Sequence, residues 1–408
     1  MKIIVVNDYA SVQGGAAQVA VASARGLADA GHHVTFIYAS GNADPLLNHP
    51  NIKLIDFQQY DLLSNPSRVK AMIIGIWNRS VEKQTSEVLD LFNKEDTIIH
   101  IHSWVKALSA SVVSVILKRK FPVVLTLHDY FTVCPNGGFY NYQEKSICQL
   151  KPMSTACLAS NCDMRSYSQK LWRYLRQTLY TKAGIPSQMK HFISVSKFSE
   201  NILKPYFPEN AKFWDVPNPI DIQSDGAANP EDSTVFSFIG RLSAEKGVAL
   251  FADASNRLEV PSRFVGAGDL DTILQQLNKN AEFTGWSSRS DVIHYIKNSR
   301  AIIFPSQLYE TQGMVVSEAA ALGVPAIVSN ACAASDFIVD GETGLLFESG
   351  NVTSLMQKIQ LLSEEPDLAK KMGQNAYEQY WNDPNNMQKH LDRLIKCYQG
   401  VLNDSKNL

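Results

Sequence analysis

The sequence FPSQLYETQGMVVSEAAALGVPAIVSN, residues 304–330, decides the fold. It begins at the end of an apolar strand (AIIFPS), passes through a polar turn into a helix-forming run, and ends on a second strand (PAIVSN). This strand-turn-helix-strand order is typical of a parallel sheet whose polar groups gather at the carboxyl ends of its strands. Glu310 and Glu318 are eight residues apart. A helix beginning near Thr311 would therefore turn both carboxylates toward one ligand.

The same alternation of strands and helices runs along the whole chain. The first half contains strand-like runs such as KIIVVNDY, HHVTFIYAS, DTIIHIHSW and PVVLTLHDY. The alternation of strands and helices begins again at TVFSFIGRL. The proline-containing run FWDVPNPIDI between the halves is predicted to be a linker. We therefore predict an α/β fold with two Rossmann-like, doubly wound domains, 1–215 and 216–380, and a C-terminal helix within 381–408 that packs back on the first domain. A cleft between two such domains is a common place for ligands.

Composition excludes several classes of protein. The 408 residues include 38 Lys and Arg against 40 Asp and Glu, so no basic excess indicates nucleic-acid binding. The N-terminal MKIIVVNDYA turns polar too early for a signal peptide and is predicted to be a core strand. No apolar run reaches the roughly 18 to 20 residues of a membrane-spanning helix. We expect a cytoplasmic protein, with membrane association left open.

Cations and glycines follow the strands of the second half. Arg241 and Lys246 come directly after TVFSFI, where the forked donors of Arg and the point charge of Lys suit a diphosphate. Ordinary surface cations are the alternative. VGAGD, with Gly266, and FTGW end the next two strands. Because parallel strands end at one edge of the sheet, one ligand could touch these loops together with Glu310.

Two features of the first half also follow strands. Gly14 and Gly15 precede a helix, where glycines let the backbone approach a phosphate and the helix N-terminus favours negative charge. The pattern is not G-x-G-x-x-G, which argues against dinucleotide binding, and a tight turn is the alternative. His128 and Asp129 end the strand LTLHDY. His128 is a candidate for the reaction centre, although a lone histidine is often structural.

Four of the six cysteines, Cys134, Cys148, Cys157 and Cys162, fall within 29 residues of an irregular excursion after His128. Four thiolates could hold a structural zinc or an iron–sulfur group in a reducing compartment. The spacing contains no C-x-x-C pair, so free thiols packed as small apolar groups are the alternative.

The run RSYSQKLWRYLRQTLYTK, residues 165–182, is cationic and carries interleaved Leu, Trp and Tyr side chains. Such a helix suits a membrane surface or an anionic acceptor. The alternative, which we favour, is an ordinary amphipathic helix packed on its domain.

Taken together, the motifs resemble the retaining glycosyltransferases of GT-B architecture known as glycosyltransferase family 4, also called glycosyl transferases group 1. The resemblance covers nearly the whole chain and rests on several motifs in order. They are the Gly14–Gly15 loop, His128, VPNPID at 216–221, GRLSAEKG at 240–247, VGAGD, and the E-x7-E spacing from Glu310 to Glu318.

The resemblance implies a role for each matching residue. Arg241 and Lys246 would bind the donor diphosphate, Glu318 the ribose hydroxyls and Glu310 the transferred sugar. His128 would lie beside that sugar at the reaction centre. The remaining donor-binding positions would be Gly14, Gly15, Asn218, Gly266 and the backbone of Gly313, Met314 and Val315. Two positions depart from the family pattern, namely Thr311-Gln312-Gly313-Met314 after the first glutamate and Asn218-Pro219 in the linker motif.

The resemblance therefore implies transfer of a sugar from a UDP- or GDP-sugar to a saccharide or a lipid-linked saccharide, in bacterial surface polysaccharide or glycolipid assembly. Catalysis would require no cofactor, and peripheral contact with the cytoplasmic membrane face would suit such an acceptor. A nucleotide-sugar epimerase or phosphorylase of the same shape, or a non-catalytic sugar-binding subunit, is the alternative.

Overall fold

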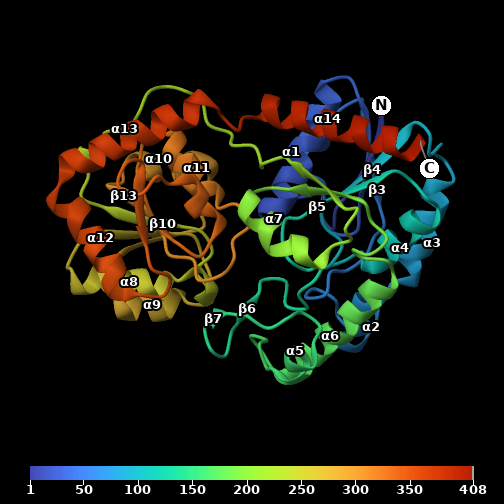
Figure 1. Cartoon of the computed structure of the whole chain (residues 1–408), viewed down its shortest axis with the longest axis horizontal. Coiled ribbons are helices and arrows are strands. Elements are labelled where there is room, and N and C mark those ends of the chain that lie inside the picture. The colour runs from blue at the N-terminus through green and yellow to red at the C-terminus, as the bar shows by residue number, and fades with distance from the viewer. Residues whose placement is uncertain (407–408) are drawn as a thin grey trace. The chain divides into compact units, whose positions relative to one another are not determined.

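The computed structural model describes residues 1–406, which form two compact units (Figure 1). The first unit contains Met1–Gly138, Leu150–Pro219 and the C-terminal segment from Met387. The second contains Phe139–Gln149 and Ile220–Asn386. Each has its own parallel sheet, so the predicted α/β fold with two Rossmann-like domains is confirmed. No helix within residues 1–406 combines the length and the apolar character needed to cross a membrane.

The sheet of the first unit has seven strands in the order β3-β2-β1-β4-β5-β8-β9, and each pairs with its neighbours in parallel. The chain moves outward from β1 to β3 and then returns past β1 to β4, as in a doubly wound sheet. The strands are β1 (Lys2–Val6), β2 (His33–Tyr38), β3 (Ile52–Asp56), β4 (Thr97–Ile101), β5 (Val123–Thr126), β8 (His191–Ser194) and β9 (Lys212–Asp215).

Helices of the first unit pack around this sheet. The C-terminal helix α14 lies beside α1, and Leu391 and Leu394 of α14 join Leu27 of α1 in one apolar core with the strands (Figure 1). The helices are α1 (Gly15–Asp29), α2 (Arg68–Ile76), α3 (Arg79–Leu89), α4 (Ala110–Lys118), α5 (Thr155–Ala159), α6 (Tyr167–Lys182), α7 (Lys197–Leu203) and α14 (Met387–Lys406), with short 3-10 turns η1 (Pro45–Leu47) and η2 (Lys204–Tyr206).

The sheet of the second unit has six parallel strands in the order β12-β11-β10-β13-β14-β15. Successive side chains of the central strand β13 (Ala301–Phe304) pack into two separate apolar cores. Ala301 and Ile303 pack with α8 (Val248–Arg257) and α12 (Val352–Glu364), whereas Ile302 and Phe304 pack with α10 (Arg289–Lys297) and α11 (Met314–Ala321). Because neighbouring side chains of a strand point to opposite faces, helices cover both faces of this sheet. The strands are β10 (Phe236–Ile239), β11 (Ser262–Val265), β12 (Glu282–Gly285), β13 (Ala301–Phe304), β14 (Ala326–Ser329) and β15 (Gly344–Phe347).

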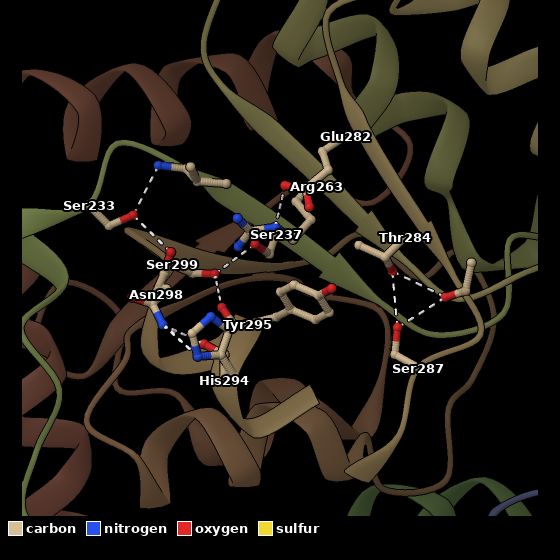
Figure 2. Close-up of polar contacts among 12 residues, drawn as sticks. Ser233, Ser237, Arg263, Glu282, Thr284, Ser287, His294, Tyr295, Asn298 and Ser299 are labelled. Atoms are coloured by element: carbon tan, nitrogen blue, oxygen red, sulfur yellow. Dashed lines mark hydrogen bonds and ion pairs between the residues drawn. The ribbon is translucent and has the colours of Figure 1, made fainter. Parts of the chain in front are cut away.

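Polar side chains fasten α10 to these strands (Figure 2). Ser299, just after α10, bonds the Ser237 hydroxyl of β10 at 2.6 Å and the Tyr295 carbonyl of α10 at 2.6 Å. Arg263 of β11 donates to Glu282 of β12 and lies over the Tyr295 ring (Figure 2). The helices of this unit are α8 (Val248–Arg257), α9 (Asp271–Leu277), α10 (Arg289–Lys297), α11 (Met314–Ala321), α12 (Val352–Glu364) and α13 (Pro366–Asn382), with 3-10 turns η3 (Pro230–Asp232), η4 (Ala244–Lys246) and η5 (Ala333–Phe337).

Part of the cysteine-containing excursion belongs to the second unit. Residues 139–149 form a small antiparallel hairpin of β6 (Tyr140–Asn141) and β7 (Ser146–Ile147). Phe139 at its base lies 6.2 Å, between ring centroids, from Tyr309 in the loop after β13. The hairpin is thus placed against the loop that carries Glu310.

Two sequence predictions about elements are wrong. The run FWDVPNPIDI is not all linker, because Lys212–Asp215 forms β9 and pairs in parallel with β8. The helix expected from Thr311 begins at Met314, after Gly313 with a left-handed φ of 79°. Glu310 therefore lies in the loop before α11, and Glu318 lies inside the helix.

Candidate functional site

The loops after β10, β11 and β13 are packed so closely in the second unit that only glycine fits at their contacts. A Cβ on Gly266 would lie 2.0 Å from the Gly240 carbonyl oxygen, and one on Gly247 would lie 1.9 Å from the Pro305 carbonyl oxygen. Both glycines also have positive φ angles. Since β11, β10 and β13 are neighbours, this packing gathers their polar loops at one edge of the sheet.

Lys246 and Glu310 form an ion pair at this edge. The Lys246 ammonium contacts Glu310 Oε1, and Ser306 donates to the same oxygen at 2.9 Å. Both charged side chains are largely buried. Two residues 64 positions apart in the chain thus meet through the loops after β10 and β13.

Arg241 also lies on the loop after β10, with its side chain largely exposed. Its guanidinium donates to Glu245 Oε1 at 2.8 Å, and Ser243 donates to the same oxygen at 2.8 Å. Glu245 is buried, so it fixes the base of the loop while Arg241 extends from it into solvent. The Arg241 side chain can leave Glu245 for a bound anion at little cost in free energy, because an ion pair with an exposed partner contributes only about 0 to 1 kcal/mol to stability.

The first turn of α11 follows Gly313, so the backbone N–H groups of Met314 and Val315 stand at a helix N-terminus. N–H groups at this position have no partner within the helix and favour an anion. Further along α11, Glu318 accepts from Arg289 at 2.6 Å, and Arg289 also donates to the Asp221 carbonyl at 3.1 Å. Sequence reasoning missed Arg289, because neither its spacing nor its neighbours mark it as the partner of Glu318.

In the first unit, Gly14 caps α1 just beyond β1. It has φ 148°, and nothing lies within 4 Å of where a Cβ would stand, so the backbone here is open. Gly15 is the first residue of α1. The loop therefore presents bare backbone at a helix N-terminus, as the sequence predicted.

His128 follows β5 and belongs to a row of three histidines in the first unit. Its Nε2 lies 3.0 Å from His102 Nδ1, and the His102 ring lies 4.0 Å from that of His100, between centroids. Burial, followed by the charge of His390, lowers the pKa of His128 to about 3. His128 is therefore a neutral imidazole at physiological pH. Burial raises the pKa of the neighbouring Asp129 to about 6.

Asp8, just after β1, is a buried carboxylate that the sequence analysis did not single out. It accepts from three backbone N–H groups, those of Lys106, Ala107 and Leu108, at 2.8 to 3.0 Å. These bonds tie the loop after β4, and with it the approach to His102, to the end of β1. Asn218 is also buried in this unit.

The structure does not assemble the metal site predicted at Cys134, Cys148, Cys157 and Cys162. Within residues 1–406, no group of three or more His, Cys, Asp or Glu side chains is placed to hold a metal ion. Instead, the Lys170 ammonium lies 3.3 Å from the sulfur of Cys157 and 3.2 Å from that of Cys162. A lysine thus occupies the position where a cation would sit. Burial acts to lower the pKa of Lys170, but the two sulfurs outweigh burial and raise it.

The structure therefore brings together part of the predicted site in each unit. Arg241, Lys246, Gly266, Glu310 and the Gly313–Glu318 segment belong to the second unit, at neighbouring strand ends. Gly14, Gly15, His128 and Asn218 belong to the first unit.

Comparison with known families covers most of the chain. The model of Glycosyltransferase Family 4 matches residues 13–224, more than half of the sequence. The model of Glycosyl transferases group 1 matches residues 220–379.

Curated relatives match over shorter stretches. The D-rhamnosyltransferase WbpZ of Pseudomonas aeruginosa is 32% identical over 152 residues, which cover 36% of this chain and 40% of that protein. The capsular polysaccharide biosynthesis glycosyltransferase CapM of Staphylococcus aureus is 27% identical over 161 residues, covering 37% of this chain and 42% of that protein. In both cases the match spans less than half of the relative's own length.

Solved structures match over almost the whole chain. Sucrose-phosphate synthase from Thermosynechococcus elongatus has a TM-score of 0.74 at 18% identity, with 99% of each chain covered. Anabaena HepE in complex with UDP and glucose has a TM-score of 0.67 at 16% identity, with 98% of this chain and 100% of that chain covered. At these identities the likeness establishes the fold, which is the predicted GT-B fold. Together with the family match over residues 13–224, it shows that the chain belongs to glycosyltransferase family 4.

Proposed function

We propose that the protein is a retaining glycosyltransferase that moves a sugar from a UDP- or GDP-sugar to a saccharide or lipid-linked saccharide acceptor. The observation that carries the proposal is the Lys246–Glu310 pair, which stands among the glycine-packed loops after β10, β11 and β13. A cation and a carboxylate at one strand edge match the two parts of the donor, an anionic diphosphate and a hydroxyl-rich sugar.

The diphosphate would be held by charge and by backbone. Departure of the sugar leaves negative charge on the diphosphate, and groups aimed at that charge in advance lower the barrier. Lys246, the exposed arm of Arg241 and the N-terminus of α11 supply such groups. The N–H groups of Met314 and Val315 would add hydrogen bonds, and Gly266 would keep the loop after β11 close to the ligand.

The ion pair also indicates how the donor enters. Lys246 and Glu310 neutralise each other in the structure. A bound donor would draw Lys246 toward its phosphate, while Glu310 accepts from hydroxyls of the transferred sugar. The freed carboxylate would then favour the oxocarbenium-like centre that develops at the anomeric carbon. Glu318, which Arg289 orients, would accept from the ribose hydroxyls.

In the first unit, Gly14 and Gly15 would let backbone approach the donor phosphate. His128 would lie beside the transferred sugar, where a neutral imidazole can exchange hydrogen bonds with hydroxyls without repelling a developing positive charge. Asn218 completes the proposed donor contacts.

The setting we propose is bacterial surface polysaccharide or glycolipid assembly. The name of one relative, the capsular polysaccharide biosynthesis glycosyltransferase CapM of Staphylococcus aureus, supports this choice. A lipid-linked acceptor would bring the enzyme to the cytoplasmic face of a membrane.

The deciding experiment incubates the purified protein with a panel of UDP- and GDP-sugars, with and without saccharide acceptors, and measures both released nucleotide and sugar product. Acceptor-dependent product with an unchanged anomeric configuration supports the proposal. Conversion of the donor sugar without any acceptor would instead indicate an epimerase. Donor binding without turnover on any acceptor would indicate a sugar-binding subunit. A Lys246→Met variant serves as the control, because it should abolish specific donor turnover.

A further inference from the structure

Helix α2 in the first unit has its large apolar side chains turned toward solvent. Val69, Met72 and Ile73 are 69%, 48% and 62% exposed, and they lie at the i, i+3, i+4 spacing of one helix stripe. The residues of α2 that are buried are the small ones, Ala71 and Gly75. A soluble amphipathic helix normally shows the opposite arrangement.

Helix α6 also has large apolar side chains that face solvent. Tyr167, Leu171 and Leu175, at i, i+4 and i+8, are 39%, 41% and 52% exposed. Its buried residues include Arg176 and Gln177. The Arg176 guanidinium lies over aromatic rings, and Gln177 donates to the Thr132 carbonyl at 3.1 Å. Polar side chains of α6 therefore pack into the protein together with Tyr180, whereas Tyr167, Leu171 and Leu175 stay exposed.

The two helices are neighbours in the first unit (Figure 1). Trp172 of α6 donates to the Met72 carbonyl of α2 at 3.1 Å. A Cβ on Gly75 would lie 2.9 Å from the Trp172 ring, so the small buried residues of α2 allow this close contact. The exposed stripes form what we call the outer face, defined by Val69, Met72, Ile73, Tyr167, Leu171 and Leu175.

The two segments that carry the outer face are basic; Asp61 and Asp163 directly precede them, and Asp163 is buried against Arg173. The segments 62–77 and 164–182 contain no Asp or Glu, although the whole chain has a net charge of −2. Their seven basic residues are Arg68, Lys70, Arg165, Lys170, Arg173, Arg176 and Lys182. Four of these, Arg68, Lys70, Arg165 and Lys182, are exposed.

Apolar stripes flanked by cations are characteristic of helices that lie in the headgroup region of a membrane. The apolar side chains leave water, and the cations are attracted to anionic lipids. A second copy of the chain is a poorer occupant, since a two-fold contact would place these cations against one another. The basic side chains of these two segments therefore favour an anionic lipid surface over self-association.

We infer that the outer face of α2 and α6 binds the headgroup region of an anionic lipid bilayer. The protein lies on the bilayer through this face, with the apolar stripes in the interface and the cations among the lipid phosphates. This surface would hold the enzyme where it can reach a lipid-linked acceptor. That purpose rests on the proposed function, whereas the binding to lipid does not.

The test is co-sedimentation of the full chain with vesicles. One set contains phosphatidylcholine alone, and the other replaces about a third of it with phosphatidylglycerol, an anionic lipid. The wild type should bind the anionic vesicles and not the neutral ones, with affinity falling as salt rises. Met72→Ser/Ile73→Ser, which removes apolar area without changing charge, and Arg68→Glu/Lys70→Glu, which reverses two cations, should each weaken binding about tenfold or more.

Matched controls keep the result specific. Ile273→Ser removes an exposed apolar side chain from α9, and Lys83→Glu reverses an exposed cation on α3. Both should bind anionic vesicles like the wild type, and all variants should keep the wild-type melting temperature. Wild-type binding that is absent, or that both α2 variants retain, would overturn the inference. So would a dimer in light scattering that these variants convert to monomer, because a second copy would then cover the face.

Vesicle binding is measured without nucleotide sugar or acceptor. Its failure can therefore be told apart from failure of the proposed sugar transfer, which is assayed on saccharides without lipid.

Discussion

At the scale of single residues, the candidate donor site consists of charges that already have partners. Lys246 pairs with Glu310, Arg241 with Glu245 and Glu318 with Arg289. A ligand must therefore compete with carboxylates for the cations, and with Arg289 for Glu318. Lys246 and Glu318 would therefore bind the donor, whereas their partners Glu310 and Arg289 would restrain its binding.

Glu310→Gln should separate binding from turnover. Removing the carboxylate charge frees Lys246, so the affinity for UDP or GDP alone should rise about fivefold, equivalent to roughly 1 kcal/mol. Turnover should fall at least about a hundredfold if the carboxylate favours the developing positive centre. Calorimetry with the nucleotide and a steady-state assay give the two quantities. Lys246→Met is the matched control and should lower nucleotide affinity; a Glu310→Gln enzyme with wild-type turnover would remove Glu310 from the reaction.

Arg289 should act only through Glu318. We expect Glu318→Gln to weaken nucleotide binding about tenfold and Arg289→Gln to weaken it less, by letting the carboxylate move. The double variant should then bind no worse than Glu318→Gln alone, since Arg289 has lost the group that it positions. Calorimetric titration of all four proteins with UDP and GDP completes the cycle. Strictly additive losses would show that Arg289 contacts the nucleotide independently.

At the scale of elements, sequence periodicity predicts which segments form strands and helices but not which of them meet. The alternation of apolar runs located β1, β5, β10 and β13 because each buried strand is bounded by turn residues. It missed β9, because Val216-Pro217 directly follows Asp215 and makes the strand look like a linker. The pairing of Lys246 with Glu310 depends on the order of strands in the sheet, which local pattern does not encode.

The four cysteines illustrate the same limit. Their spacing allows a metal site, yet the position of α6 places Lys170 against Cys157 and Cys162. Similarly, the sequence of α6 predicts an amphipathic helix, but only its packing shows that Arg176 and Gln177 are buried together with Tyr180. Helix α6 is thus packed on its domain, as the sequence-based preference expected, but it leaves Leu171 and Leu175 exposed.

Helix α14 should contribute strongly to the stability of the first unit, through one buried hydrogen bond in particular. Tyr398 Oη lies 2.7 Å from His100 Nδ1, and both side chains are buried. Tyr398→Phe leaves that nitrogen without its partner, which should lower the free energy of unfolding by about 1 to 3 kcal/mol. Urea unfolding measures the change. Tyr60→Phe, at an exposed tyrosine, is the control and should change stability by less than about 0.5 kcal/mol.

At the scale of the whole molecule, the two units differ in how acid should affect them. Of the nine histidines, only His294 lies in the second unit. In the first unit, burial is the largest cause that lowers the pKa of six of them, to about 4 for His191 and His390 and to about 3 for His128. The other three are His32, His100 and His102, and the pKa values of His100 and His102 lie well below the ordinary value.

These shifts fix the direction of the pH effect. A histidine whose pKa is lower in the folded state binds its proton more readily when unfolded, so stability is full above about pH 6.5 and is lost as pH falls below it. At about pH 5, protonation of His128, His191 and His390 in the unfolded state should each lower the free energy of unfolding by roughly 2 kcal/mol. Asp129 acts in the opposite direction, since its raised pKa lets the folded state take up a proton near pH 6, worth about 1 kcal/mol at pH 5. Asp129 offsets only part of this loss, so the free energy of unfolding of the first unit should fall by several kcal/mol.

Mild acid should therefore open the first unit before the second. Hydrogen exchange followed by mass spectrometry at about pH 7.5 and about pH 5, corrected for the intrinsic exchange rate, should show protection lost in β1 and β4 while β10 and β13 keep theirs. His390→Gln should reduce this loss, because the amide can still bond Ser23 and the Pro217 carbonyl but does not titrate. His294→Gln, at an exposed histidine of the second unit, should leave it unchanged. Equal loss of protection in both units would contradict the assignment of acid sensitivity to the buried histidines.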